Sequence, residues 1–361
     1  MTHSLAAVFD GSAGEIELRE FPLPHPHEGE ILVRVLGCTL CASDRHSFEG
    51  RRVVPVPTVL GHEIVGEIVE LGPAAPEYDL AGRELRLGDR VAWAIVAACG
   101  ECLFCRRGLP QKCERGVKYG HERLGPGREL LGGLAQHCLL VRGTSIVRLP
   151  EDVPLAVACP AGCATATIAA ALESAGELWE RNVCVMGAGM LGLTAVAMSR
   201  SCGAAEVVCV DPHPFRRDQA LSFGATSIVS PDGLADAMPA GGGPCRFDVV
   251  LEISGQPAAF HAAWPLIRTG GTLVLVGSVF PSEAVPVSLE QIVRRHLTIR
   301  GVHNYAPRHL LRAVEFLASQ QKSYPFDSLV RRWYPLAAVR DAFAASANPE
   351  NVRVGVDPTL A

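Results

Sequence analysis

The stretch NVCVMGAGMLGLTAVAMSRSCGAAEVVCVD, residues 182–211, decides the fold of one part of this chain. It opens with a short apolar run, passes through the glycine-rich turn GAGMLG, continues as an apolar segment of helix length, and closes with a second β-type run. A strand, a tight turn, a helix and a second strand in this order form a βαβ unit. The stretch therefore predicts a parallel sheet.

The turn within this unit has the spacing GxGxxG, with Gly187, Gly189 and Gly192 at the glycine positions. Glycines let a backbone approach a pyrophosphate, and the amides at the helix start, those of Met190 and Leu191 included, offer N–H groups to an anion. The motif is weak alone, but here it directly follows a strand and opens a helix. That context is typical of a dinucleotide-binding site.

Asp211 ends the second strand and follows Gly192 by 19 residues. A carboxylate at this place accepts hydrogen bonds from the ribose hydroxyls of the cofactor and repels a 2′-phosphate. NAD is therefore favoured over NADP. Arg216 and Arg217 follow closely, and arginines there can hold a 2′-phosphate, so NADP stays as the alternative.

The alternation of strands and helices continues after residue 211, with the apolar runs FDVVLEIS (247–254) and GTLVLVGS (271–278). The earlier part differs, because its β-type runs, such as EILVRVLG (30–37), are bounded by turn residues without helix-length segments between them. A length of 361 residues also favours two domains. We predict an α/β protein with a doubly wound, parallel-sheet Rossmann domain over 156–298. Residues 1–155 form a mostly-β domain, to which residues 299–361 return.

Composition excludes several classes of protein. Lys and Arg total 33 against 38 Asp and Glu, and neither sign forms a long block, so a nucleic-acid binder is not expected. No uninterrupted apolar run is long enough to cross a membrane, and the first residues lack the features of a secretion signal. We expect a cytoplasmic protein. The 13 cysteines are then examined first as metal ligands and not as disulfides.

Four cysteines follow the pattern CxxCxxCx7C: Cys99, Cys102, Cys105 and Cys113. Four thiolates can surround one tetrahedral ion with bonds of about 2.3 Å, and zinc is the ion we expect. A closed shell of four ligands leaves no open position, so this zinc would have a structural role. Four unrelated buried cysteines and an iron–sulfur cluster are the alternatives.

A second candidate metal site is open and comprises Cys41, in CASDRH, and His62, in GHEIVG. A thiolate and an imidazole from two loops suit a zinc that keeps a position free for substrate. Ser43 and His46 follow Cys41 closely and can form a relay that carries a proton from an alcohol to water. Asp44 and Glu63 adjoin the site and can orient imidazoles, although Glu63 could also bind the metal directly in some states.

These segments resemble the zinc-dependent medium-chain alcohol dehydrogenase family. The resemblance extends over nearly the whole chain, and it is carried by CASDRH, GHEIVGEIVELGPAA, LGDRV and the four-cysteine lobe. It implies a GroES-like catalytic domain, a Rossmann domain and two zinc ions per subunit. In family branches that use a second cysteine ligand, a threonine follows it by four residues and the first fingerprint glycine by about 24, a spacing that Cys163 and Thr167 match. Cys163 is thus the expected third ligand, with Cys159 as the alternative, and Thr167 is an expected cofactor contact.

The resemblance also implies roles for two arginines and for the reaction. Arg216 corresponds to a basic residue near the adenosine ribose, and Arg353 to a residue that in some members contacts pyrophosphate; a solvated surface position is the alternative for Arg353. Zinc, a proton relay and NAD together imply hydride transfer between an alcohol carbon and nicotinamide. The partner is a small alcohol or carbonyl compound, and a homodimer or homotetramer is expected.

The runs CRRGLPQKC, KYGHE and CATATIAAAL further resemble alcohol dehydrogenases associated with phosphonate catabolism. A hydroxyalkyl phosphonate or phosphate is therefore one expected substrate class, and a polyol or cyclitol is the alternative. An anionic substrate needs cations, for which the first domain offers Arg45, Arg51, Arg52, Lys118, His121 and Arg123. A zinc-free quinone reductase and a non-enzymatic zinc-binding module explain less of the sequence, because the first lacks the zinc ligands and the second lacks the dinucleotide fingerprint.

Overall fold

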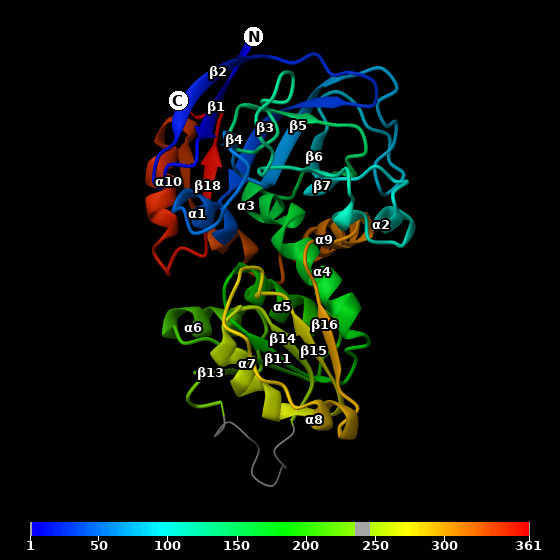
Figure 1. Cartoon of the computed structure of the whole chain (residues 1–361), viewed down its shortest axis with the longest axis vertical. Helices are drawn as coiled ribbons and strands as arrows, with labels where there is room; N and C mark the ends of the chain where they lie inside the picture. Colours follow the sequence, from blue (N-terminus) through cyan, green and yellow to red (C-terminus); the bar gives the residue numbers. More distant parts are fainter. Residues whose placement is uncertain (1, 235–245, 361) are drawn as a thin grey trace. The chain divides into compact units, whose positions relative to one another are not determined.

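The computed structural model describes residues 2–234 and 246–360, which pack into two compact units (Figure 1). Unit 1 comprises Met1–Ala166 and Asn304–Ala361, and unit 2 comprises Thr167–His303. The first boundary between the two units lies at 166/167, later in the sequence than the expected one at 155/156. The reason is that the 3-10 helix η2 (Cys159–Gly162) packs on the sheet of unit 1. The second lies at 303/304, where 298/299 was expected.

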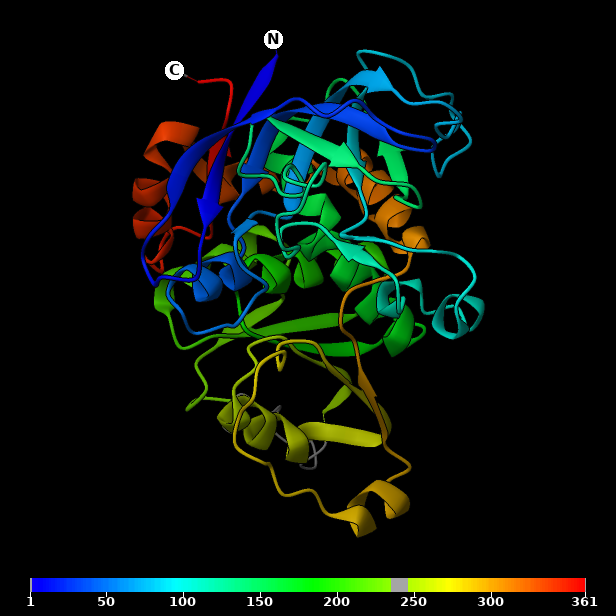
Figure 2. The ribbon, with the colours of Figure 1, turned by 45° about the horizontal axis from the view of Figure 1, so that its top comes forward.

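Unit 2 is built on a parallel sheet in the order β13-β12-β11-β14-β15-β16, with β16 at one edge (Figure 2). Its strands are β11 (Asn182–Met186), β12 (Glu206–Val210), β13 (Ser227–Val229), β14 (Phe247–Glu252), β15 (Ile267–Leu275) and β16 (Thr298–Gly301). Its helices are α5 (Met190–Ser201), α6 (Pro214–Ser222), α7 (Pro257–Ala263), η3 (Trp264–Leu266) and α8 (Leu289–Arg294). This strand order is that of a Rossmann fold, so the predicted α/β class is confirmed.

Unit 1 is mostly β and has a mixed sheet in the order β10-β6-β5-β3-β18-β17, with β9 also paired to β3. Its strands are β1 (His3–Phe9), β2 (Glu17–Pro22), β3 (Ile31–Thr39), β4 (Thr58–Val59), β5 (Glu63–Leu71), β6 (Arg90–Trp93), β7 (Val96–Ala97), β8 (Val117–Lys118), β9 (His137–Leu140), β10 (Ile146–Arg148), β17 (Val330–Pro335) and β18 (Arg353–Asp357). The C-terminal segment contributes β17 and β18 to this sheet. Figure 1 shows β18, in red, among the blue N-terminal strands.

The helices of unit 1 are short apart from α9. They are α1 (Ala42–Phe48), α2 (Leu103–Arg106), η1 (Pro110–Lys112), α3 (Leu155–Ala158), η2, α9 (Pro307–Gln320), η4 (Phe326–Leu329), η5 (Leu336–Ala338) and α10 (Val339–Ser346). Helix α4 (Ala164–Ala175) crosses the boundary between the units. Three helices begin with a proline: α9 in unit 1, and α6 and α7 in unit 2. The first residue of a helix needs no N–H for a hydrogen bond within the helix, so proline is tolerated there.

The core of unit 1 lies along its central strands, where Val33 and Val35 of β3 pack in one cluster with Ile64 and Ile68 of β5. These alternate positions place the intervening side chains on the opposite face. Within the described residues no single helix is both long and apolar enough to cross a membrane. Taken together, the bent pair of helical segments Leu155–Gly162 and Ala164–Ala175 is long and apolar enough to cross one, by length and composition alone.

Candidate active site

The structure brings together the three residues expected to bind the catalytic metal. Cys41 precedes α1, His62 precedes β5, and Cys163 lies between η2 and α4, so all three belong to unit 1. Their ligand atoms all lie within 4.8 Å of one another. Two thiols and an imidazole this close match a zinc donor set, and three protein ligands leave a fourth position for substrate. Cys159 is not part of the group: it is fully buried, and burial raises its pKa.

Asp44 connects the two ligand-bearing loops. Its Oδ1 accepts hydrogen bonds from His62 Nδ1 at 3.0 Å and from the backbone N–H of Gly61 at 3.1 Å, and its Oδ2 accepts one from the backbone N–H of Cys41 at 3.0 Å. The carboxylate is buried. Because Asp44 accepts a hydrogen bond from Nδ1–H of His62, Nε2 is the nitrogen of His62 that is left for a metal.

The groups around the candidate ligands shift the pKa values of His62 and Cys41 in opposite directions. Burial alone would lower the pKa of His62, but the charge and hydrogen bond of Asp44, with those of Cys41, raise it to about 10. A hydrogen bond from Cys163 lowers the pKa of Cys41; burial opposes this effect and the Arg353 charge adds to it. The imidazole is therefore basic and one thiol is acidic. A metal ion must displace the remaining protons when it binds.

Glu63 forms a buried ion pair with Arg353. The guanidinium donates from Nε to Glu63 Oε2 at 3.0 Å and from Nη2 to Oε1 at 3.1 Å, and Thr39 Oγ1 also donates to Oε2 at 2.6 Å. Nη2 of Arg353 further lies 3.7 Å from Cys41 Sγ. The surface position considered for Arg353 is therefore wrong, since its exposed fraction is 7%. Both carboxylate oxygens of Glu63 are engaged, which favours a neighbouring role over direct metal binding.

The two residues of the expected proton relay lie on α1, next to Cys41. Ser43 Oγ is 3.4 Å from His62 Nε2, the metal-facing nitrogen. His46 is half-buried one helical turn later, where burial and the charges of Arg51 and Arg45 lower its pKa. Residues three apart on a helix share a face, so Ser43 and His46 follow the metal-facing nitrogen in the order that a proton relay needs. The transfer itself stays a prediction.

Cations lie beside the candidate metal site. The rings of His62 and His121 are 5.1 Å apart, and Arg52 Nη1 donates to His121 Nε2 at 2.7 Å. Lys118 is half-buried on the short strand β8. Among the other expected cations, Arg45 donates to a backbone carbonyl at 2.9 Å, Arg51 is paired with Glu49, and Arg123 is exposed.

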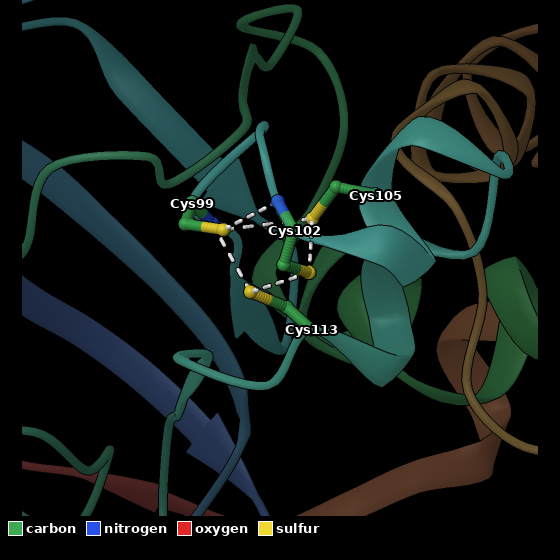
Figure 3. A group of neighbouring side chains, drawn as sticks. All are labelled: Cys99, Cys102, Cys105 and Cys113. Carbon is green, nitrogen blue, oxygen red and sulfur yellow. Dashed lines mark hydrogen bonds between the residues drawn. The ribbon is translucent and has the colours of Figure 1, made fainter.

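The four-cysteine lobe is compact, and its sulfurs point toward one another (Figure 3). Sγ–Sγ distances of 3.5 Å (Cys102–Cys105) and 3.9 Å (Cys99–Cys105 and Cys102–Cys113) lie near the edge of about 3.8 Å expected for a tetrahedron of zinc–sulfur bonds. Backbone N–H groups of Glu101 and Cys102 lower the pKa of Cys99 to about 6. The donor set fits a structural zinc.

The glycine turn of unit 2 has three different steric requirements. Gly187 has φ +108°, a conformation that side chains rarely adopt, and a Cβ on Gly192 would meet the Gly187 carbonyl oxygen at 1.8 Å. A Cβ on Gly189 would instead meet nothing within 4 Å. Gly189 thus leaves a space at the N-terminus of α5, where the amides of Met190 and Leu191 have no acceptor within the helix. This cradle fits a dinucleotide pyrophosphate.

Asp211 follows β12, is buried, and is fixed to the same turn. Its carboxylate accepts hydrogen bonds from the backbone N–H groups of Ala188 and His213, both at 2.8 Å. Arg217 donates to the Asp211 carbonyl at 2.7 Å, and Arg216 is half-buried in α6. Thr167 lies on α4, one turn after Cys163. The structure therefore groups Asp211 with the glycine turn, while the contacts of Arg216 and Thr167 with a cofactor stay predictions.

Sequence reasoning missed the partners of two residues that it had named. Nothing in the local sequence connects Arg353 with Glu63, from which it is separated by 290 residues. His121 had been considered only as a cation, whereas it packs on a candidate metal ligand and accepts a hydrogen bond from Arg52. The segment KYGHE, with a lysine and a histidine three residues apart next to glycine, was the available signal.

Known families and proteins match both units. The model of the alcohol dehydrogenase GroES-like domain matches residues 27–151, and the model of zinc-binding dehydrogenases matches residues 191–319. The L-threonine 3-dehydrogenase of Edwardsiella ictaluri is 31% identical over 80% of this chain and 81% of its own. An alcohol dehydrogenase from Thermotoga maritima has a TM-score of 0.88 and 28% identity, with 98% of this chain and 99% of that chain covered. A zinc-binding dehydrogenase from Sinorhizobium meliloti, solved with NADP, has a TM-score of 0.86 and 26% identity and covers 99% of this chain and 100% of its own.

Proposed function

Because the chain belongs to the zinc-dependent medium-chain alcohol dehydrogenase family, we propose that it transfers a hydride between an alcohol carbon and the nicotinamide of NAD. It is an oxidoreductase that acts on CH–OH groups, with zinc and a nicotinamide dinucleotide as the cofactors typical of its family. The observation that carries the proposal is the open donor set of Cys41, His62 and Cys163 in contact with the Ser43 hydroxyl.

These three residues would hold the catalytic zinc, and Cys99, Cys102, Cys105 and Cys113 a second, structural zinc. When bound, the catalytic zinc supplies a Lewis acid and the dinucleotide a hydride acceptor. Asp44 keeps His62 in the tautomer that presents Nε2. The Glu63–Arg353 pair places a positive charge beside the Cys41 sulfur, which stabilises its thiolate form.

Ser43 and His46 handle the proton that an alcohol loses when it is oxidised. Ser43 Oγ accepts this proton and passes its own toward His46, from which water removes it. The low pKa of His46 suits this task, because the imidazole releases a proton readily near neutral pH. In the direction of carbonyl reduction the same groups return a proton to the substrate oxygen.

NAD is the proposed dinucleotide, with NADP as the alternative. The buried Asp211 carboxylate is held against the glycine turn by the N–H groups of Ala188 and His213, so its charge is fixed near the place expected for the ribose. A 2′-phosphate would meet that charge. The half-buried Arg216 and Arg217 are the groups that would oppose this preference.

The proposed substrate is an alcohol that carries a phosphonate or phosphate group, supported by the cations beside His62. A polyol or cyclitol is the alternative, and a substrate screen separates the two. Purified enzyme is assayed with NAD and NADP against hydroxyalkyl phosphonates, polyols and simple alcohols. Failure to turn over any alcohol would contradict the proposed activity.

Zinc content and one pair of variants test the mechanism. Two zinc ions per chain are expected, whereas one would favour a zinc-binding module and none a zinc-free reductase. Ser43→Ala should lower kcat by about a hundredfold or more with zinc and NAD binding unchanged. Ser47→Ala is the matched control, since Ser47 lies on the same helix and donates only to the Ser43 carbonyl at 3.0 Å. Equal kcat values for the two variants would refute the proton relay.

We also infer a homo-oligomer, formed through the edge of the sheet in unit 2. Strand β16 pairs with β15 on one side, and Ile299 on β16 is 37% exposed. Leu289 and Val293 of the preceding helix α8 are 75% and 71% exposed. Exposed apolar residues beside an open strand edge favour pairing with another chain. Light scattering should report a dimer or tetramer that Ile299→Lys weakens; a monomeric wild-type protein would contradict the inference.

A further inference from the structure

We propose that Arg52 and Lys118 form a subsite for the anionic end of the substrate, so that the enzyme prefers alcohols carrying an oxyanion such as a phosphonate, phosphate or carboxylate. This inference rests on the proposed alcohol dehydrogenase function. It adds the residues that recognise the part of the substrate remote from the reacting carbon.

His121 connects this subsite to the candidate metal site. Its ring packs 5.1 Å from that of His62, and it is buried. His121 Nδ1 lies 2.9 Å from the Tyr119 carbonyl oxygen, which can only accept, so Nδ1 carries the proton. Nε2 is then the acceptor for Arg52 Nη1, at 2.7 Å. A neutral histidine thus orients the Arg52 guanidinium beside the metal ligand without neutralising its charge.

Lys118 is a second cation near His121, and no carboxylate of the described residues is paired with its ammonium group. No carboxylate of the described residues lies within 4.0 Å of its ammonium group, and none of their acceptors takes a hydrogen bond from it. Burial and the charge of Arg52 lower its pKa to about 8, while the charges of Cys163 and Cys41 partly oppose this. The backbone N–H of His121 donates to the Lys118 carbonyl oxygen at 3.0 Å, so Lys118 belongs to the same turn as the imidazole that holds Arg52.

The nearby carboxylates hold other groups, and Glu122 Oε1 accepts a hydrogen bond at 2.7 Å from the backbone N–H of Lys118 and not from its ammonium group. Asp44 is paired with His62, Glu63 with Arg353, and Glu49 with Arg51. The half-buried Lys118 ammonium costs free energy unless an anion pairs with it. A bound oxyanion offsets this cost, because its oxygens can accept charge-assisted hydrogen bonds from the Lys118 ammonium group and from the Arg52 guanidinium. The chemistry of the subsite therefore matches an anionic substrate group better than a neutral hydroxyl.

Three alcohols of similar length test this subsite on the zinc-loaded enzyme: 2-hydroxyethylphosphonate, 3-hydroxypropanoate and 1-propanol. The variants are Arg52→Gln and Lys118→Met, with Arg123→Gln as the control for an exposed arginine in the neighbouring segment. The kinetic readout is the ratio of kcat/KM for each anionic alcohol to kcat/KM for 1-propanol. Calorimetric titration with ethylphosphonate and with propanoate, which have no hydroxyl to oxidise, measures anion binding without turnover.

We expect wild-type enzyme to prefer at least one anionic alcohol to 1-propanol. Each subsite variant should lower that ratio, and weaken ethylphosphonate or propanoate binding, at least about tenfold, as for loss of one charge-assisted hydrogen bond. Arg123→Gln should match wild type, and Lys118→Arg should recover part of the ratio lost in Lys118→Met. The preferred anion distinguishes a phosphonate or phosphate from a carboxylate.

Two results separate this proposal from the proposed function. If 1-propanol is oxidised as well as both anionic alcohols and the subsite variants match Arg123→Gln, the subsite is refuted and the dehydrogenase activity stands. If no alcohol is oxidised but ethylphosphonate still binds and Arg52→Gln abolishes the binding, the anion subsite stands and the activity is refuted. Thermal melting of each variant checks that it is folded.

Discussion

Replacement of Arg353 by methionine should destabilise unit 1 strongly. The change leaves the buried Glu63 carboxylate without the two hydrogen bonds of 3.0 and 3.1 Å that its charge receives from the guanidinium. Hydrogen bonds to charged groups contribute about 1.5–3 kcal/mol each, and removal of one partner from a buried ion pair costs about 3–5 kcal/mol. We expect a loss of about 3–5 kcal/mol, a large share of the roughly 5–15 kcal/mol that stabilises a typical domain.

Hydrogen exchange measured by mass spectrometry is the suitable assay, because it reports on each unit separately. Amides of β5 and β18 should exchange on the order of a hundredfold or more faster in Arg353→Met, under conditions where exchange follows the opening equilibrium. Peptides from β11 and β14 of unit 2 are the internal control and should change little. Stability loss and zinc content are measured on the same samples.

The double variant Arg353→Met/Glu63→Gln tests the cause. Glutamine keeps the shape of Glu63 and can still accept from Thr39 Oγ1, but it removes the unpaired charge. It should recover at least half of the lost protection. The ion-pair argument is refuted if Arg353→Met accelerates exchange less than about fivefold, equivalent to about 1 kcal/mol, or if the double variant is as unstable as the single one.

Cys163→Ala should lower zinc from two ions to one per chain and abolish turnover, whereas Cys159→Ala should keep both ions; metal analysis that shows two ions in Cys163→Ala would contradict the ligand set. Asp211→Gly should lower the ratio of NAD to NADP kcat/KM about tenfold or more, on the order of 1.4 kcal/mol, unless wild type already prefers NADP. Burial opposes ionisation of Asp79, but hydrogen bonds from Arg83 and from two backbone N–H groups outweigh it and lower its pKa. This lowered pKa gives stability that is present above the unfolded value of about 3.9 and is lost as pH falls through the folded pKa. Urea melts of Asp79→Asn should therefore show a deficit of about 1–3 kcal/mol at pH 7 that shrinks below pH of about 4, and a constant deficit would refute the assignment.

Local patterns were sufficient for much of the fold and for several candidate ligands. The glycine turn at 187–192 and the four cysteines at 99–113 each lie within one short segment, so their spacing alone restricts the geometry. The parallel sheet of unit 2 could be predicted from alternating strands and helices, because parallel strands need crossover helices. Cys163 was selected over Cys159 by spacing from the glycine turn, and the structure places Cys163 with Cys41 and His62.

The contacts that surround those ligands could not be predicted in the same way. Glu63 meets Arg353, and His62 meets His121, because antiparallel strands and loops distant in sequence converge in unit 1. A single sequence carries no pairing information for such contacts. The orientation of Asp44 toward both ligand loops likewise depends on the start of α1 and on the turn at Gly61.

The position of β18 has a consequence for how the protein is made. This strand pairs with Cys38 and Thr39 of β3, and it begins with Arg353, the partner of Glu63. During translation, β3 and β5 therefore leave the ribosome first, and all of unit 2 follows. The strand β18, which completes the sheet of unit 1, emerges only after that. At roughly 5–20 residues per second the wait lasts on the order of tens of seconds. During that time unit 2, which is continuous in sequence, can fold by itself, while Glu63 has a carboxylate but no guanidinium. The part of unit 1 that carries the candidate metal ligands is thus the last part of a nascent chain to close.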